Sequence, residues 1–316
     1  MTHNNETPVR LRQFAKSVAA ATLFLIFAGA MVTSTGSALA VPDWPLAYGM
    51  VFPPMVGGIF YEHGHRMIAA TVGFLTVIQA VWLQLREPKR FVRLLGWTSV
   101  GAVIAQGLLG GLTVLFLLPP AISIGHAALA EIFFCLNVSI AFFTSAFFAG
   151  RAPSAAANNS PVRLSTVVAG LVYVQILLGA LMRHLGAGLA IPDFPLSFGR
   201  IVPPLHSLPV AANFAHRAGA LIVTLAILLL GVSVSRLAAA HPVRRLYQVL
   251  VSVLGAQVML GAYTVWSAKH PIVTSLHVTI GALTLAMSLL LCLAVRTVAM
   301  PEERLESAVL RQEVTA

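Results

Sequence analysis

The chain contains little charge and almost no cysteine. Charged residues make up 9% of its 316 residues, and hydrophobic residues make up 58%. Soluble domains contain roughly 25% charged residues, so this composition excludes an ordinary soluble domain. Cys135 and Cys292 each lie alone inside an apolar run. We therefore expect neither a disulfide nor a cysteine-ligated metal, and we interpret both cysteines as small buried side chains.

Acidic residues are especially few: 10 Asp and Glu stand against 20 Lys and Arg, which gives a net charge of +10. A basic surface for nucleic acid is one explanation. The Lys and Arg residues, however, gather in the N-terminal tail, in three connections between apolar runs, and from Arg296 onwards. This bias is typical of the cytoplasmic segments of membrane proteins. It predicts that both termini are cytoplasmic and that nucleic acid is not a partner.

Long apolar runs dominate the rest of the chain. A helix needs about 20 residues to cross a bilayer, and eight runs have about this length or more. They cover residues 16–34, 64–85, 93–118, 122–149, 163–182, 213–236, 245–267 and 271–297. We predict an all-α polytopic membrane protein with eight transmembrane helices.

The two halves of the sequence resemble each other. Residues 36–49 and 186–199 share the motif Leu-Ala-x-Pro-Asp-x-Pro-Leu, and a shift of 151 residues aligns His126 with His277. A register kept over polar positions predicts a tandem duplication. Because each copy holds four apolar runs, both copies enter the membrane in the same orientation, as a parallel repeat of two four-helix bundles.

Five segments follow from this pattern. They are an N-terminal cytoplasmic tail, the N-terminal four-helix repeat, a polar cytoplasmic linker, the C-terminal four-helix repeat and a C-terminal cytoplasmic tail. In that order they cover residues 1–15, 16–149, 150–162, 163–297 and 298–316.

The first outer loop, residues 35–62, contains four prolines and four glycines. Such a segment cannot continue a helix. Its Trp44 and Tyr48 suit the aromatic belt at a membrane interface. Two interpretations remain open: an interfacial turn, or a lid over a site at the outer ends of the helices.

Four histidines in repeat register are candidate ligands. His65 and His126 lie near the outer ends of two runs in the first half, and His216 and His277 hold the equivalent places in the second. A single histidine in a membrane is more often a hydrogen-bonded core residue, because an unpaired polar ring in lipid is costly. Two repeat-related pairs on different helices instead favour a planar macrocycle clamped between imidazoles.

Carboxylates distinguish the first half from the second. Glu62 lies three residues before His65 and shares its helical face if the helix has begun there, whereas its equivalent is Asn213. This difference predicts a division of labour, with chemistry in the first half and a permanent cofactor in the second. Glu131 is either a protonated, hydrogen-bonded carboxyl or part of a proton path.

The combination of eight runs, Pro-Asp-Trp-Pro after the first, Glu-x-x-His-Arg opening the second and four repeat-related histidines resembles the haem A synthase family. The resemblance covers about residues 16–297. It implies oxidation of the C8 methyl group of haem O to the formyl group of haem A, by successive hydroxylations. It also implies a bacterial inner-membrane location.

The resemblance assigns roles to individual residues. The haem b cofactor of the C-terminal half is matched to His216, His277 and Arg217. The haem O substrate of the N-terminal half is matched to His65, His126 and Arg66. The essential glutamate of the family is matched to Glu62. The two arginines either pair with haem propionates or anchor their helices at the interface.

One departure from the family concerns cysteine. Many members carry two cysteines in the first outer loop, where this chain has Val41 and Ala47, and the second loop has Ile191 and Ser197. A thiol-based electron relay or covalent capture of haem through these positions is therefore excluded in this chain.

Two other functions compete with this one. A bis-His dihaem electron-transfer cytochrome would carry the same histidines, although a carboxylate in only one half argues against it. A transporter or haem-handling scaffold is disfavoured by the parallel repeat and the ligand-like histidines. Haem O synthase and an electron acceptor are the further partners that the enzyme reaction would involve, and the sequence identifies neither.

Overall fold

The computed structural model describes residues 7–148, 160–235 and 241–298. Within these ranges the chain forms eight long α-helices and one short 3-10 turn, η1, at Ala187–Leu189. The helices are α1 (Val9–Ser34), α2 (Gly58–Arg86), α3 (Arg90–Leu115), α4 (Pro120–Phe143), α5 (Ser160–His184), α6 (Leu208–Ser235), α7 (His241–Trp266) and α8 (Pro271–Val298). All eight are long and apolar enough to cross a membrane. The predicted all-α fold with eight spans is confirmed.

Several helix ends differ from those expected. Helix α1 begins at Val9 and not near residue 16, because Leu11 and Ala15 are fully buried against residues of neighbouring helices such as Leu83 and Ile140. Helix α2 begins at Gly58, so the Glu-x-x-His-Arg segment lies within its first turns. The predicted linker and C-terminal tail lie mostly outside the described residues.

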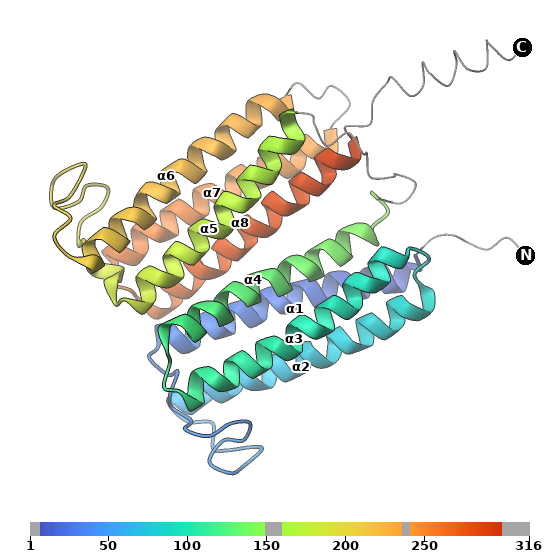
Figure 1. Cartoon of the computed structure of the whole chain (residues 1–316), viewed down its shortest axis with the longest axis horizontal. Coiled ribbons are helices and arrows are strands. Elements are labelled where there is room, and N and C mark those ends of the chain that lie inside the picture. Colours follow the sequence, from blue (N-terminus) through green and yellow to red (C-terminus); the bar gives the residue numbers. More distant parts are fainter. Residues whose placement is uncertain (1–6, 149–159, 236–240, 299–316) are drawn as a thin grey trace, which may run out of the picture.

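The helices form two groups of four, α1 to α4 and α5 to α8 (Figure 1). In the first group α1 contacts α2 and α4, and α3 contacts the same two helices. In the second group α5 and α7 each contact α6 and α8. The same neighbour relations therefore occur in both groups, which supports the predicted tandem arrangement.

The groups meet along a seam made by α1, α4, α5 and α8. Its apolar contacts include Phe134 and Val138 of α4 against Ala282 and Ala286 of α8. Small residues on α8 allow close helix contact, as in other membrane bundles. The many exposed apolar side chains elsewhere, such as Phe74, suit contact with lipid tails.

Both long loops, residues 35–57 and 185–207, emerge at the same end of the molecule (Figure 1). The beginning of α1 and the end of α8 lie at the opposite end. A candidate site near the first turns of α2 and α6 therefore lies at the end of the molecule from which these loops emerge. The assignment of the terminal end to the cytoplasm stays a prediction.

Candidate functional site

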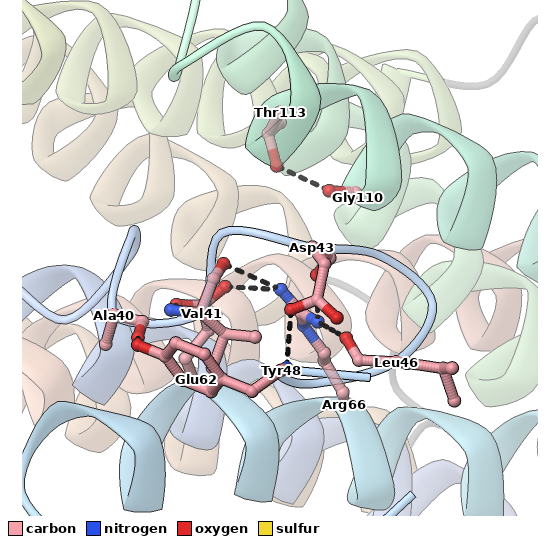
Figure 2. Close-up of polar contacts among 9 residues, drawn as sticks. All are labelled: Ala40, Val41, Asp43, Leu46, Tyr48, Glu62, Arg66, Gly110 and Thr113. Carbon is pink, nitrogen blue, oxygen red and sulfur yellow. Dashed lines mark hydrogen bonds and ion pairs between the residues drawn. The ribbon is translucent and has the colours of Figure 1, made fainter. Parts of the chain in front are cut away.

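Arg66 holds the first outer loop in place. Its Nη1 donates to the backbone oxygens of Asp43 (2.7 Å) and Leu46 (2.8 Å), as Figure 2 shows. Its Nη2 donates to Glu62 Oε1 (2.6 Å) and more weakly to the backbone oxygen of Val41 (3.4 Å). One guanidinium therefore fixes three points of the loop to α2.

Asp43 closes the tip of this loop. Its carboxylate accepts hydrogen bonds from the backbone N–H groups of Tyr48 (2.7 Å) and Gly49 (2.8 Å), two residues with positive φ. These hydrogen bonds, first from Gly49 and then from Tyr48, lower the pKa of Asp43 below its ordinary value. The tip is thus held by a charged carboxylate at neutral pH.

The second outer loop repeats this construction. Arg217 donates to the backbone oxygens of Asp193 (2.7 Å), Leu196 (3.0 Å) and Ile191 (2.9 Å). Asp193 accepts from the backbone of Phe198 and Gly199, which lowers its pKa in the same way. In both halves the arginine therefore organises the loop, a role that its sequence position alone did not indicate.

Glu62 is buried beneath the first loop, with 4% of its surface exposed. Besides the ion pair with Arg66, its Oε2 accepts from the backbone N–H of Val41 (2.8 Å). Because α2 begins at Gly58, Glu62 and His65 are helical and one turn apart, as expected. The carboxylate thus connects the loop to the helix that carries the candidate ligand.

In the second half an amide replaces this carboxylate. Asn213 is buried, and its Nδ2 donates to the backbone oxygens of Ala187 (2.8 Å) and Gly188 (3.3 Å). Because an amide carries no charge, the ion pair between Arg66 and Glu62 has no equivalent between Arg217 and Asn213. Glu62 accepts a hydrogen bond from its loop and can also take up a proton. Asn213 donates hydrogen bonds to its loop and cannot act as an acid or a base at ordinary pH.

The first loop also reaches α3, the next helix of the bundle. A Cβ at Gly111 of α3 would lie 2.7 Å from Cδ2 of Trp44, so the indole occupies the space that glycine leaves. The neighbouring Gly110 faces His126. Thr113 Oγ1 donates to the backbone oxygen of Gly110 at 2.6 Å (Figure 2). The packing of Trp44 on Gly111 extends the loop over α3, which favours the lid over the simple interfacial turn.

Each of the four histidine rings rests against a glycine of a neighbouring helix. A Cβ placed on that glycine would lie 2.9–3.2 Å from Cε1 of the ring. The pairs are Gly29 with His65, Gly110 with His126, Gly179 with His216, and Gly261 with His277. The glycines themselves follow the repeat register, a signal already present in the sequence. One edge of each ring is thus fixed, while each residue stays partly exposed.

In the second half the two rings face each other across the bundle. The centroids of His216 and His277 are 6.4 Å apart, with an interplanar angle of 85°. A metal held by one nitrogen of each ring at about 2 Å, the usual metal–imidazole distance, would separate the centroids by roughly 6 Å.

The support behind the rings differs between the halves. His216 Nδ1 contacts Gln175 Nε2 at 3.0 Å, and His277 Nδ1 lies 3.2 Å from the backbone oxygen of Gln257. The Nδ1 atoms of His65 and His126 are buried and without a hydrogen-bond partner, and Gln106 Nε2 instead donates to the backbone oxygen of His126 (2.9 Å) and lies 3.4 Å from its Nε2. Sequence reasoning missed Gln175, although a glutamine inside an apolar run was the available signal.

Other singled-out residues lie outside this geometry. His63 Nε2 pairs with the backbone oxygen of Val51 (3.0 Å), so it also ties the loop to α2. Glu131 is buried, and its Oε2 has no partner. Cys292 is buried, as predicted, whereas Cys135 is only half-buried. A groove of about 490 Å³ along α7, beside Arg245, is lined by none of the four histidines.

Comparison with known proteins decides the family. The sequence matches the COX15-CtaA family, described as cytochrome oxidase assembly protein, over residues 56–289. This chain belongs to that family. The matched region includes Glu62 and all four histidines, so the family assignment and the geometry concern the same residues.

Individual relatives of this cytochrome oxidase assembly family member are named haem A synthase. The protein from Symbiobacterium thermophilum is 32% identical over 259 residues, which is 80% of this chain and 84% of the relative. That from Alkalihalophilus pseudofirmus is 33% identical over 228 residues, or 70% and 75%. That from Geobacillus kaustophilus is 27% identical over 306 residues, or 91% and 92%. Together with the eight apolar helices, these bacterial relatives identify a multi-pass bacterial membrane protein.

Proposed function

We propose that this protein is a haem A synthase, which oxidises the C8 methyl group of haem O to the formyl group of haem A. One observation carries the assignment: two equivalent histidine pairs share one architecture, and only the first pair has a buried carboxylate one turn away. An electron carrier would need no such difference. The family and its named relatives support the same reading.

The residues present fit a haem in each half. Imidazoles are haem-iron ligands, and each of the four rings is braced on one edge and still partly accessible. We assign His216 and His277 to haem b, with Arg217 holding the loop above them. The haem b supplies one-electron transfer when bound. We assign His65 and His126 to the substrate, haem O, with Arg66 as the equivalent loop-holding residue.

Glu62 is the catalytic residue of the proposal. With water as the source of oxygen, conversion of a methyl group to a formyl group consumes one water and releases four protons and four electrons. Glu62 would accept protons leaving the substrate carbon and stabilise positive charge that develops there. Its ion pair with Arg66 favours the charged carboxylate and holds it beneath the loop. The four electrons pass to a separate electron acceptor.

The arginines act on the haems mainly through the loops. Nη1 and Nη2 of both side chains already donate to backbone oxygens, and in Arg66 also to Glu62. This arrangement favours anchoring over direct pairing with haem propionates. Each guanidinium holds its loop over the histidine site, and the loop shields the site from water. The arginines therefore act on the site without touching the reacting atoms.

The test is extraction of pigments followed by mass spectrometry, on protein purified from a host that makes haem O. We expect haem b together with haem A or its hydroxylated intermediate. Glu62→Gln should abolish both oxidised products and leave haem b unchanged, whereas Glu131→Gln, a matched buried carboxylate, should leave haem A formation largely intact. Two haem b per chain, with no oxidised haem, would instead establish the electron-transfer cytochrome.

A further inference from the structure

Gln175 lies in the middle of the apolar helix α5 and contacts one candidate ligand twice. Its Nε2 lies 3.0 Å from His216 Nδ1 and donates to the backbone oxygen of His216 at 2.7 Å. A polar amide is costly inside a membrane unless it has partners, and these partners belong to the ligand residue itself. Gln175 therefore fixes both the ring and the main chain of His216.

The neighbouring helix makes room for this amide. A Cβ at Gly219 of α6 would collide with Gln175 Oε1, so any larger residue there would displace the glutamine. The 150-residue shift that superposes Gly29 on Gly179 places Leu25 at the position of Gln175. The 151-residue shift of the following helix places Ile68 at the position of Gly219. The first half thus has two apolar side chains where the second has an amide and a space.

The chemistry of a ligated histidine explains what this exchange does. When Nε2 binds iron, Nδ1 carries the proton and needs an acceptor, and such outer partners fix the ring and raise its basicity. In the structure the donor end of the Gln175 amide, Nε2, faces Nδ1, and the acceptor end, Oε1, lies against Gly219 and is buried without a partner. Turning the amide over would exchange the hydrogen bond to the backbone oxygen of His216 for an acceptor on the Nδ1 proton. In the first half, Gln106 Nε2 also donates to the backbone oxygen of a ligand, His126 (2.9 Å), but it lies 3.4 Å from Nε2 of that ring, and the Nδ1 atoms of His65 and His126 have no partner.

We propose that Gln175, seated on Gly219, is the positioning residue that makes the C-terminal half retain its haem, while Leu25 and Ile68 leave the N-terminal half able to release its haem after oxidation. This inference rests on the proposed function, because it explains why one of two similar sites holds a cofactor and the other turns over a substrate. It attributes the difference in haem retention between the two sites to Gln175, which contacts His216 on the side away from the haem.

The first experiment follows loss of haem b from the purified holoprotein to excess apomyoglobin. Gln175→Leu should release haem b at least about tenfold faster than the wild type, the usual scale for loss of an outer-shell partner. The matched control is Gln248→Leu, the same change on the exposed face of α7 in the same half. Equal release by Gln175→Leu and the wild type would overturn the inference.

A second readout separates positioning from packing. Gln175→Glu keeps an acceptor and makes it stronger, so the midpoint potential of haem b should fall below that of the wild type. Gln175→Leu removes the acceptor, so the potential should rise. A role in packing alone would change retention without this order of potentials, and an unordered result would therefore contradict the proposal.

The reciprocal change tests the first half. Leu25→Gln combined with Ile68→Gly should increase the haem retained per chain towards two and lower the number of haem A molecules released per protein. Ile68→Gly alone, which creates space without an amide, is the control. If the double variant releases haem A as fast as the control, Gln175 does not determine retention. If the wild type binds no haem b at all, the proposed function fails first, and the two failures are thereby distinguished.

Discussion

The two halves of this molecule share their framework and differ in what surrounds the ligands. Both have a loop held by an arginine and an aspartate, and both have histidines resting on glycines. The first half adds the buried carboxylate of Glu62, whereas the second adds the Gln175 amide beside Nδ1 of a ligand; the Gln106 amide of the first half lies beside Nε2 of His126 instead. The comparison teaches that a duplicated bundle can be specialised without moving its ligands, by changing the residues behind or above them.

Some of these differences occur as pairs that match in volume. Trp44 fills the space above Gly111, whereas its equivalent, Phe194, packs edge-on against Trp266 at 6.0 Å and the position of Gly111 is held by Ala262. A larger ring thus accompanies a glycine, and a smaller ring accompanies an alanine. Such matching indicates that each half is packed around its own lid.

The largest expected effect comes from removing one ligand in each half. His216→Leu should abolish haem b binding, because one imidazole cannot replace two axial ligands. His65→Leu should keep haem b and abolish haem A formation. The measurement is the optical spectrum of the purified protein together with extracted pigments. Loss of haem b in the His65 variant, with His216→Leu unaffected, would reverse the assignment of the halves.

A smaller effect should follow from replacing a glycine that lies against a histidine ring. Gly179→Ala would push a methyl group against the ring of His216, and overpacking of this kind costs about 1–3 kcal/mol. We expect haem b affinity to fall about tenfold. Gly170→Ala is the matched control on the same helix, because nothing lies within 4 Å of its added Cβ. Equal haem affinity in the two variants would show that the glycine does not position the ring.

The lid comparison predicts a change that is confined to the first half. Gly111→Ala should lower haem A formation, because its Cβ collides with Trp44. Adding Trp44→Phe reproduces the pairing of the second half and should recover part of the loss, which a double-mutant cycle would measure as coupling. Haem b content should stay constant throughout. Independent, additive losses would mean that the two residues do not act as a unit.

Much of this architecture could be predicted from the sequence because it depends on patterns. Eight apolar runs predicted eight helices, and repeat register singled out His65, His126, His216 and His277. The beginning of α2 was harder to predict. The helix starts at Gly58, which depends on how the loop packs, whereas the apolar run itself begins later. Local composition therefore predicted the spans better than their ends.

Contacts between distant segments could not be read in the same way. The hold of Arg66 on Asp43 and Leu46 joins residues about 20 positions apart through backbone oxygens, which have no sequence signature. The seat of Gln175 on Gly219 likewise joins two helices. Both involve a polar group meeting a backbone or a missing side chain, and only the folded arrangement brings these together.

The smallest expected effect concerns the loop carboxylates and pH. The folded pKa of Asp43 is lowered from 3.8 by the N–H groups of Gly49 and Tyr48, so its contribution is fully present above 3.8 and is lost as pH falls through the lower folded value. Glu62 also holds this loop, so it is changed to Gln in the test protein, together with Trp82, Trp97 and Trp266 to Phe. Fluorescence of Trp44 should then stay constant from pH 7 to about pH 4 and change only below. Asp43→Asn should alter the signal at neutral pH already, because the amide offers one acceptor where the carboxylate offers two. Asp193→Asn should leave it unchanged, since that residue holds the other loop. A midpoint above pH 5 would mean that the tip is not held by a charged Asp43, and the likeness between the two loops would then be one of shape only.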